Sequence, residues 1–352
     1  MKDNPILQLT KNGLYCEAGD FYVDPWQPVH RAVVTHAHSD HARWGCGSYL
    51  VARAGEGVLR ARLGQEAVIQ GVEYGEPVSF GGVSLSLHPA GHILGSAQVR
   101  LEHRGEVWVV SGDYKLESDV TCASFYPVRC HTFITEATFG LPIYRWVVQS
   151  DVFTDINTWW QANQSAGKAS LLFGYALGKA QRLLAGLDAS IGPIFTHGAV
   201  ERLNRAYRES GVRLPDTMIA GLAPRGTDWS RSIIIAPPSA NGTPWTRRFG
   251  PLSTGFASGW MQIRGLRRRR SVDRGFVLSD HADWPDLMSA INATGAQRVY
   301  VTHGYVGVVV RWLLEKGLNA VAIPTRFEGE QDEKTGPPPS TDDPDSGEEL
   351  LP

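Results

Sequence analysis

The sequence has little cysteine and no long apolar run. Its 352 residues include four cysteines, and none of them forms a C-x-x-C pair. We therefore expect ordinary thiols in a reducing compartment rather than disulfides or thiolate metal ligands. A run of about 18 apolar residues is absent, and the first residues, MKDNPILQLTKNG, lack the layout of a signal peptide. We therefore expect no membrane segment and a cytoplasmic location.

Neither sign of charge dominates, because the formal net charge is −2, but the charges are unevenly distributed. Residues 328–352 hold nine acidic residues and one lysine, a net of −8, whereas residues 1–327 carry +6. The tail is rich in proline and acid with almost nothing to bury, so we predict that it is disordered. The body contains the run Arg267 to Arg270. This run is compatible with a polyanionic partner, although a solvated surface would have the same composition.

Seven strand-like segments each deliver a carboxylate or an imidazole near their carboxyl ends. They are FYVD with Asp24, RAVVTH with His36, VSLSLHPAGH with His92, EVWVVSGD with Asp113, TFITEAT with Glu136, GFVLSDH with His281 and QRVYVTH with His303. This regular placement favours a sheet system whose strand ends converge on one cleft. Histidines scattered through a core would not follow the strands in this way.

The segment VVTHAHSDHARWG, residues 33–45, concentrates candidate metal ligands. It places His36, His38, Asp40 and His41 within six positions. Such hydrated groups are unfavourable side by side unless a cation holds them, and the alternative, a solvated polar loop, needs no histidines. One cation cannot take these four together with the candidates from the other strands, but two cations sharing a carboxylate can. Imidazole and carboxylate ligands without thiolate favour zinc, with manganese or iron as alternatives.

Hydrolysis is the reaction that such a pair of cations favours. Two divalent ions lower the pKa of a bridging water toward ~7 and neutralise charge on a phosphoryl oxygen. A phosphate diester also needs its leaving alkoxide protonated, and an imidazolium supported by a glutamate, as with His281 and Glu136, is a competent general acid. The alternative for each is a structural hydrogen bond. Asp24 is expected to orient a ligand histidine from behind rather than to bind metal. The remaining histidines fit no convergent pattern: His30, His88, His103, His131 and His197.

The middle of the chain follows a different plan. DVFTDINTWWQANQSAG has apolar residues at helical spacing, and two later segments read as strand, turn and helix, which predicts an α/β unit with a largely parallel sheet. Candidate metal ligands flank this block on both sides, so we predict an inserted domain at residues 146–271. In LLFGYALGKAQRLL, Lys179 and Arg182 lie in the first turn of a helix, which is suited to a backbone phosphate, although many strand-to-helix turns look alike.

Taken in order, the motifs resemble those of metallo-β-lactamase-fold nucleases with a β-CASP insertion, a group that includes RNase J, Artemis and the cleavage nuclease of mRNA 3′-end formation. The matching elements are Asp24, HAHSDH, PAGHILGSA, SGDY, TEATFG, SDHAD and THG. More narrowly, LYCEAGDFYVDPW, HPAGHILGSAQVR and GLPIYRW are similar to the bacterial DNA ligase-associated exonucleases. The resemblance implies an αββα sandwich built from residues 1–145 and 272–327, with residues 146–271 as the β-CASP domain.

The resemblance also implies roles for individual residues. One zinc would be held by His36, His38 and His92, the other by Asp40, His41 and His303, and Asp113 would bridge the two. The candidate catalytic residues are Asp40, Glu136 and His281, and the candidate nucleic-acid contacts are Lys179, Arg182, Arg267 and Arg268. The implied cofactors are two Zn²⁺ ions, with Mn²⁺ as an alternative activating metal. The implied partners are DNA or RNA, an ATP-dependent DNA ligase and a helicase.

Four functions are consistent with these features. The first is a DNA exonuclease that processes DNA ends in repair. The second is a ribonuclease, because a histidine at the position of His303 is commonest in relatives that cleave RNA. The third is a nucleic-acid-binding scaffold without catalysis, against which the complete ligand set argues. The fourth is a small-molecule hydrolase, which would have no obvious use for the insertion.

Overall fold

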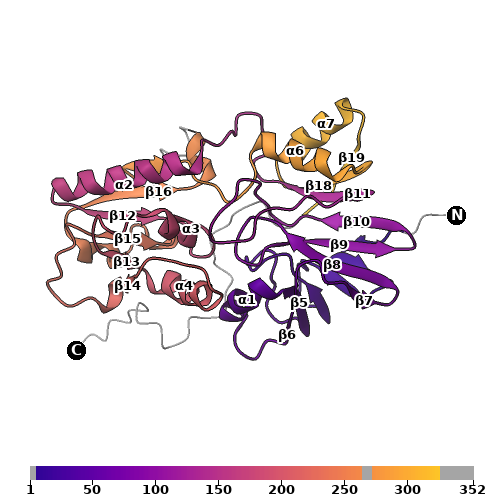
Figure 1. The fold of residues 1–352 in the computed structure, drawn as a ribbon, viewed down its shortest axis with the longest axis horizontal. Coiled ribbons are helices and arrows are strands. Elements are labelled where there is room, and N and C mark those ends of the chain that lie inside the picture. Colours follow the sequence, from indigo (N-terminus) through magenta and orange to yellow (C-terminus); the bar gives the residue numbers. More distant parts are fainter. Residues whose placement is uncertain (1–4, 264–271, 326–352) are drawn as a thin grey trace. The chain divides into compact units, whose positions relative to one another are not determined.

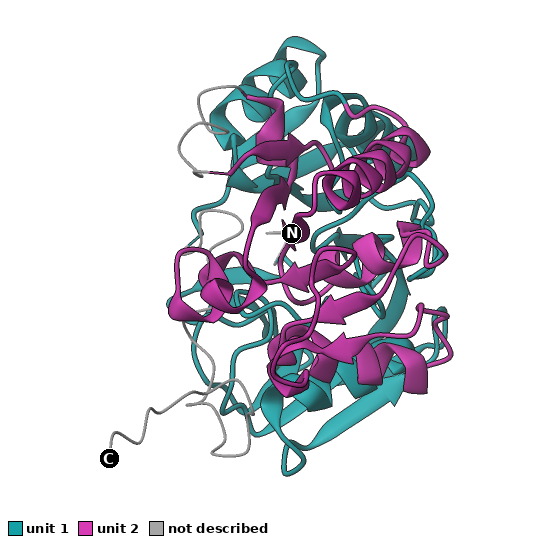
Figure 2. Ribbon diagram, turned by 90° about the vertical axis from the view of Figure 1, so that its left-hand side faces the viewer, with its two compact units in different colours: residues 1–145, 280–333 teal, residues 146–279, 334–352 magenta. Residues whose placement is uncertain are grey.

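The computed structural model describes residues 5–263 and 272–325 (Figure 1). Contacts divide the chain into two compact units, residues 1–145 with 280–333 and residues 146–279 with 334–352 (Figure 2). Two separate stretches of sequence therefore build the first unit. The predicted acidic tail and the arginines Arg267 and Arg268 lie outside the described residues. Among the helices of the described part, none is long and apolar enough to cross a membrane.

The first sheet of unit 1 has six strands in sequence order, β1-β2-β3-β4-β5-β6. They are β1 (Gln8–Thr10), β2 (Gly13–Cys16), β3 (Phe21–Val23), β4 (Arg31–Val33), β5 (Ser48–Ala52) and β6 (Ile69–Val72). Strands β3 to β6 run parallel, whereas β1, β2 and β3 pair antiparallel. Because parallel strands end at the same edge, the residues that follow β3 and β4 emerge side by side.

The second sheet has seven strands in the order β19-β18-β11-β10-β9-β8-β7. They are β7 (Val78–Phe80), β8 (Val83–Pro89), β9 (Ala97–His103), β10 (Glu106–Val110), β11 (Thr132–Ala137), β18 (Arg298–Gly304) and β19 (Asn319–Ala322). Strands β7 to β10 pair antiparallel, and β10, β11, β18 and β19 pair parallel. The carboxyl ends of three neighbouring strands, β10, β11 and β18, therefore meet at one edge.

The two sheets share one apolar core, and helices cover the outer face of the second sheet. On β10, Trp108 and Val110 belong to the core between the sheets, whereas Val109 packs with residues of α6 and α7 on the opposite face. This alternation is the two-residue period of a strand buried on both faces. The helices of unit 1 are α1 (Glu56–Leu63), α6 (Trp284–Thr294) and α7 (Val306–Glu315).

Unit 2 contains a six-stranded sheet in the order β14-β13-β15-β12-β16-β17, and every pairing in it is parallel. Its strands are β12 (Ala169–Phe173), β13 (Ile194–Thr196), β14 (Met218–Ile219), β15 (Ile233–Ala236), β16 (Leu252–Ala257) and β17 (Arg274–Phe276). The described residues of this unit also form the helices α2 (Gln149–Ser165), α3 (Lys179–Gly186) and α4 (Gly198–Glu209). Strands β12 and β15 are buried at every residue, as expected for a parallel sheet covered on both faces.

Short 3-10 helices connect some of these elements. They span Arg53–Gly55, Ala220–Leu222, Pro238–Ala240, Pro244–Phe249 and Gly259–Gln262. The predictions of an α/β fold, of a parallel sheet in the middle block and of four free cysteines are confirmed. The finer assignment of unit 1 to a metallo-β-lactamase sandwich, and of residues 146–271 to a β-CASP domain, stays a prediction.

Candidate metal centre

The strand ends of unit 1 carry most of the candidate ligands. Asp24 directly follows β3, and His36 comes three residues after the end of β4. Asp113 comes three residues after β10, whereas His303 is the next-to-last residue of β18. Residues from both stretches of unit 1 thus reach one edge of the two sheets.

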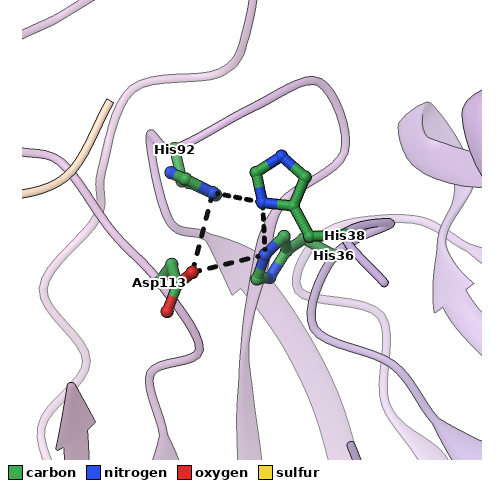
Figure 3. Close-up of side chains that lie close together, drawn as sticks. All are labelled: His36, His38, His92 and Asp113. Atoms are coloured by element: carbon green, nitrogen blue, oxygen red, sulfur yellow. Dashed lines mark hydrogen bonds and ion pairs between the residues drawn. The ribbon is translucent and has the colours of Figure 1, made fainter. Parts of the chain in front are cut away.

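Four of the candidate ligands form a compact first group: His36, His38, His92 and Asp113 (Figure 3). Nδ1 of His38 lies 3.1 Å from Nε2 of His36 and 3.1 Å from Nε2 of His92. Oδ2 of Asp113 lies 3.5 Å from Nε2 of His36 and 3.8 Å from Nε2 of His92. Ligands of a tetrahedral zinc, each about 2.0–2.1 Å from the metal, lie about 3.3–3.4 Å apart. The first group therefore has dimensions that suit such an ion.

The protonation of His92 favours a cation in this first group. Its Nδ1 lies 2.9 Å from the backbone oxygen of Asp280, and because a carbonyl only accepts, Nδ1 carries the hydrogen. Burial, and secondarily the neighbouring His281, lowers the pKa of His92 well below its usual range, so the ring is neutral and Nε2 presents a lone pair. Burial and His41 likewise lower the pKa of His36. Neutral imidazoles and a carboxylate that face one another repel unless a cation lies between them.

A second group consists of Asp40, His41 and His303. Nδ1 of His41 lies 2.7 Å from Oδ2 of Asp24, so the carboxylate behind the ring takes the Nδ1 hydrogen. Nε2 of His41 lies 3.7 Å from Oδ2 of Asp40 and 3.5 Å from Oδ2 of Asp113. This buried nitrogen has no hydrogen-bond partner among the described residues. Asp24 orients the ring through Nδ1, while the buried Nε2 has no hydrogen-bond partner in the described part of the chain, so Nε2 is suited to act as a metal ligand.

Electrostatics in the second group also favour a cation. Burial alone would lower the pKa of His41, but the carboxylates of Asp113, Asp40 and Asp24 outweigh it and hold this pKa well above its usual range. Burial of Asp113 would raise the pKa of its carboxyl group, but His41 and His281 outweigh it and keep this pKa well below its usual range. The surroundings therefore stabilise a positive charge at the point where His41 faces these carboxylates.

Two site residues have a backbone conformation that favours glycine. Asp24 has a φ of 44° and His303 a φ of 54°, both in the left-handed region. Gly304 follows with a φ of 74°, and a Cβ there would lie 2.3 Å from the backbone oxygen of Ala137. Backbone strain of this kind is concentrated at functional sites.

The protonation of His303 also suits a ligand. Burial, and secondarily His41, lowers the pKa of His303, so this ring is neutral and available as a ligand.

Glu136 and His281 form a buried pair beside Asp113. Nδ1 of His281 lies 3.0 Å from each carboxylate oxygen of Glu136. Oε1 of Glu136 also accepts a hydrogen bond of 2.9 Å from the backbone N–H of Tyr114, which fixes the carboxylate. Asp113, Glu136 and His281 have ligand atoms within 4.8 Å of one another. A histidine supported in this way, next to the metal groups, is placed to donate a proton.

The sequence reasoning missed two residues, Asp280 and Thr35. The backbone oxygen of Asp280 orients His92. The carboxylate of Asp280 also lies close to ligand atoms of His92 and His281. The hydroxyl of Thr35 lies 3.1 Å from Nδ1 of His36. Both residues directly precede a predicted site histidine, and this adjacency is the signal that was available. The contact from the backbone oxygen of Asp280 could not be predicted from residue type, because every residue has a backbone carbonyl.

The two predicted phosphate contacts of unit 2, Lys179 and Arg182, make hydrogen bonds to other residues of that unit. Nζ of Lys179 donates a 3.1 Å hydrogen bond to the backbone oxygen of Leu278, and Arg182 donates one of 3.1 Å to Oε1 of Gln149. Both cationic side chains are buried, with exposed fractions of 0% and 1%. These contacts do not test the binding of nucleic acid, so the role of both residues toward it stays a prediction.

No family model matches the chain. The chain is 34% identical over 317 residues, 89% of its length, to a protein named "Probable DNA ligase" from Opitutus terrae, of which the match covers 30%. It is 28% identical over 165 residues, 45% of its length, to "Cleavage and polyadenylation specificity factor 73" of Drosophila melanogaster, covering 24% of that protein. It is 29% identical over 122 residues, 34% of its length, to "Endoribonuclease YSH1" of Saccharomyces cerevisiae, covering 15%. The chain thus spans less than a third of these curated relatives.

A solved structure has a similar fold. It is the crystal structure of a protein of unknown function from Enterococcus faecalis V583, with a TM-score of 0.57 and 12% identity over 85% of this chain and 80% of that one. This likeness concerns the fold alone. The similarity in sequence to the specificity factor and the YSH1 protein supports the resemblance to the β-CASP nucleases at the level of the family.

Proposed function

We propose that this chain is a metal-dependent nuclease of the β-CASP type that binds two Zn²⁺ ions. One observation carries the proposal: Oδ2 of Asp113 lies 3.5 Å from Nε2 of His36 and 3.5 Å from Nε2 of His41. A single carboxylate oxygen thus stands between two groups of ligands, as in two-metal hydrolases. In this proposal residues 1–145 and 272–327 form the metallo-β-lactamase domain, and residues 146–271 form the β-CASP domain.

The residues of the site divide the work of phosphodiester hydrolysis. His36, His38 and His92 would hold one ion, Asp40, His41 and His303 the other, and Asp113 both. Ions bound there would activate a water molecule and offset the charge that builds on the phosphoryl group. Glu136 holds Nδ1 of His281, and this imidazole would donate the proton that the leaving alkoxide requires.

DNA is the substrate we favour, and end processing by an exonuclease is the activity. The similarity to the protein named a DNA ligase extends over 89% of the chain, whereas the similarity to the YSH1 protein extends over 34%. The match covers 30% of the ligase-named protein, which supports an ATP-dependent DNA ligase as a partner in repair. We extend this partnership to a helicase on the narrower resemblance alone.

RNA is the second candidate substrate, because one relative is named an endoribonuclease and because His303 joins the second ligand group. A scaffold without catalysis is the third candidate. The complete set of converging ligands argues against it.

The experiment compares DNA and RNA oligomers of matched sequence, labelled at the 5′ or the 3′ end, in single- and double-stranded form with Zn²⁺ or Mn²⁺. We expect release of short products from labelled DNA by the wild-type protein and at least a 100-fold slower reaction for His38→Ala, because one ligand of the first group is lost. The matched control is His30→Ala, since His30 is exposed and outside both groups.

Three outcomes would contradict parts of the proposal. Equal cleavage by wild-type and His38→Ala protein would refute catalysis at this site. Much faster turnover of RNA would reverse the order of substrates. Bound metal and retained DNA affinity without cleavage of either polymer would favour the scaffold.

A further inference from the structure

The hydroxyl group of Thr35 lies between the two proposed metal groups. Thr35 follows strand β4 and is 1% exposed. Its Oγ1 lies 2.6 Å from Oδ2 of Asp24 and 3.1 Å from Nδ1 of His36. Its backbone N–H donates a 2.8 Å hydrogen bond to the other oxygen of Asp24. Thr35 thus joins the carboxylate behind His41 to a histidine of the other group.

The hydrogens available on these groups decide which atom donates in each hydrogen bond. A carboxylate only accepts, so the hydroxyl of Thr35 and Nδ1 of His41 both donate to Oδ2 of Asp24. The hydroxyl has one hydrogen, which it gives to Asp24, so toward His36 it can only accept. His36 must therefore carry its hydrogen on Nδ1. Oγ1 also lies 3.4 Å from Nδ1 of His41, but the hydrogen of that ring goes to the nearer carboxylate at 2.7 Å.

The consequence appears at the opposite nitrogen of each ring. With Nδ1 protonated, a neutral His36 presents a lone pair at Nε2, which lies 3.5 Å from Oδ2 of Asp113. We propose that Thr35 is a positioning residue: its hydroxyl donates to Asp24 and accepts from Nδ1 of His36, and it thereby selects the tautomer of His36 that carries its hydrogen on Nδ1. His41 carries a hydrogen on the same ring nitrogen, but there Asp24 accepts it directly. Asp24 thereby orients both groups, one directly and one through the hydroxyl of Thr35.

The packing around Thr35 holds the hydroxyl in this place. Gly112 has a φ of 58°, and a Cβ on it would lie 2.6 Å from Cβ and 2.6 Å from Oγ1 of Thr35. The loop that carries Asp113 therefore rests directly on the threonine side chain. The backbone oxygen of Thr35 also accepts a 2.7 Å hydrogen bond from the N–H of Ala97, which ties it to strand β9.

Two substitutions separate the hydroxyl from the shape of the side chain. Thr35→Val keeps the volume and removes the hydroxyl, whereas Thr35→Ser keeps the hydroxyl and removes a methyl group. The first measurement is long-range ¹H–¹⁵N NMR of the histidine rings in the full-length, metal-free protein at pH 8, with the His36 signals identified by their loss in His36→Gln. We expect Nδ1–H on His36 in the wild type and in Thr35→Ser, and a shift toward Nε2–H in Thr35→Val.

The second measurement is Zn²⁺ affinity by competition with a chelator. Loss of a hydrogen-bond partner behind a ligand histidine weakens binding by about 10–100-fold, so we expect this loss for Thr35→Val and a change of less than about 3-fold for Thr35→Ser. His41 keeps Asp24 as its direct partner, so its Nδ1 hydrogen should persist in both variants. Thermal unfolding of the metal-free proteins checks that each variant folds.

Two results would overturn the inference. One is an unchanged Nδ1–H tautomer of His36 together with unchanged Zn²⁺ affinity in Thr35→Val. The other is equal loss of affinity in the Ser and Val variants, which would show a role in packing alone. If Thr35→Val does not fold, Thr35→Ala replaces it, and the same contrast with Thr35→Ser applies.

The inference rests on the proposed two-metal function for its biological meaning, but its test does not depend on nuclease activity. The tautomer of His36 is read in the absence of metal and substrate. A protein with the expected tautomers and no cleavage of nucleic acid would contradict the proposed function and leave the relay supported. Cleavage with an unaltered His36 in Thr35→Val would do the reverse.

Discussion

At the scale of single residues, contacts behind the imidazole rings decide which nitrogen faces the site. The carbonyl of Asp280 takes the Nδ1 hydrogen of His92, and the carboxylate of Asp24 takes that of His41. Metal-binding histidines are commonly held in this way, because the outer partner fixes the ring and strengthens the ligand nitrogen. The residues behind the ligands therefore contribute to metal affinity without touching the metal.

The pair of Glu136 and His281 gives a prediction at this scale. Glu136→Gln keeps the size of the side chain but removes the negative charge that supports a protonated His281, 3.0 Å away. If His281 is the general acid, the maximal rate of phosphodiester cleavage should fall by about 10²–10⁴-fold. Metal content should stay at the wild-type value, because Glu136 belongs to neither proposed ligand group.

The measurement is steady-state cleavage together with elemental analysis of each protein. Glu315→Gln on α7, where the side chain is exposed, is the matched control. An unchanged rate in Glu136→Gln would mean that the pair is a structural hydrogen bond. Loss of metal would mean that Glu136 supports the ligands instead.

At the scale of elements, parallel strands bring the site together. β3 and β4 pair parallel in one sheet, and β10, β11 and β18 pair parallel in the other, so their carboxyl ends share an edge. Helix α6 starts directly after the SDHAD segment, and Asp283 caps it by accepting a 3.0 Å hydrogen bond from the backbone N–H of Asp286. The segment that carries His281 is therefore anchored by the start of a helix.

This helix start gives a prediction about pH. Burial, and then the neighbouring Asp283, raises the pKa of Asp286 to about 6 from an ordinary value of 3.8. Between these two pH values the folded state retains a proton that the unfolded state has lost, so stability falls as the pH rises toward 6. Two pKa units correspond to about 3 kcal/mol, which solvent screening of this half-buried carboxylate reduces to about 1 kcal/mol.

Asp286→Asn should therefore be more stable than the wild type by about 1 kcal/mol at pH 8 and equally stable at pH 4. Denaturant unfolding of the metal-free proteins at both pH values measures the difference. Subtracting the two proteins cancels the titration of the metal-site groups, which both contain. A constant difference at the two pH values would contradict the assignment to Asp286.

At the scale of the whole molecule, both proposed metal groups belong to unit 1. His36, His41 and Asp113 come from its first stretch and His303 from its second. Metal binding should therefore stabilise unit 1 by linking these two stretches. Unit 2 has its own parallel sheet and apolar core, and it contributes no residue to either group.

Zn²⁺ should accordingly raise the stability of unit 1 selectively. At a free concentration 1,000 times the dissociation constant, the gain is about 4 kcal/mol. Hydrogen exchange should slow in β10 and β18 and stay unchanged in β15 when Zn²⁺ is added to the metal-free protein. His38→Ala should show a smaller effect in β10, and equal protection of β15 would contradict this selectivity.

The sequence alone predicted the kinds of side chain offered as metal ligands, the α/β pattern of the chain and the parallel sheet of the middle block. These features follow from residue type and periodicity, which are local. It also indicated that Asp24, Glu136 and His281 accompany the ligands. It did not reveal Asp280 or Thr35, and it named Lys179 and Arg182 as candidate phosphate contacts without indicating that both side chains are buried.

Which side chains meet depends on how distant segments of the chain pack. Asp113 lies between His36 and His41. His303 joins Asp40 and His41, although more than 250 residues separate His303 from both of them in the chain. These distances depend on how the two sheets of unit 1 pack over their shared core, which no local pattern encodes. The direction of each hydrogen bond follows in turn from those distances, because a carbonyl or carboxylate within reach decides where an imidazole keeps its proton.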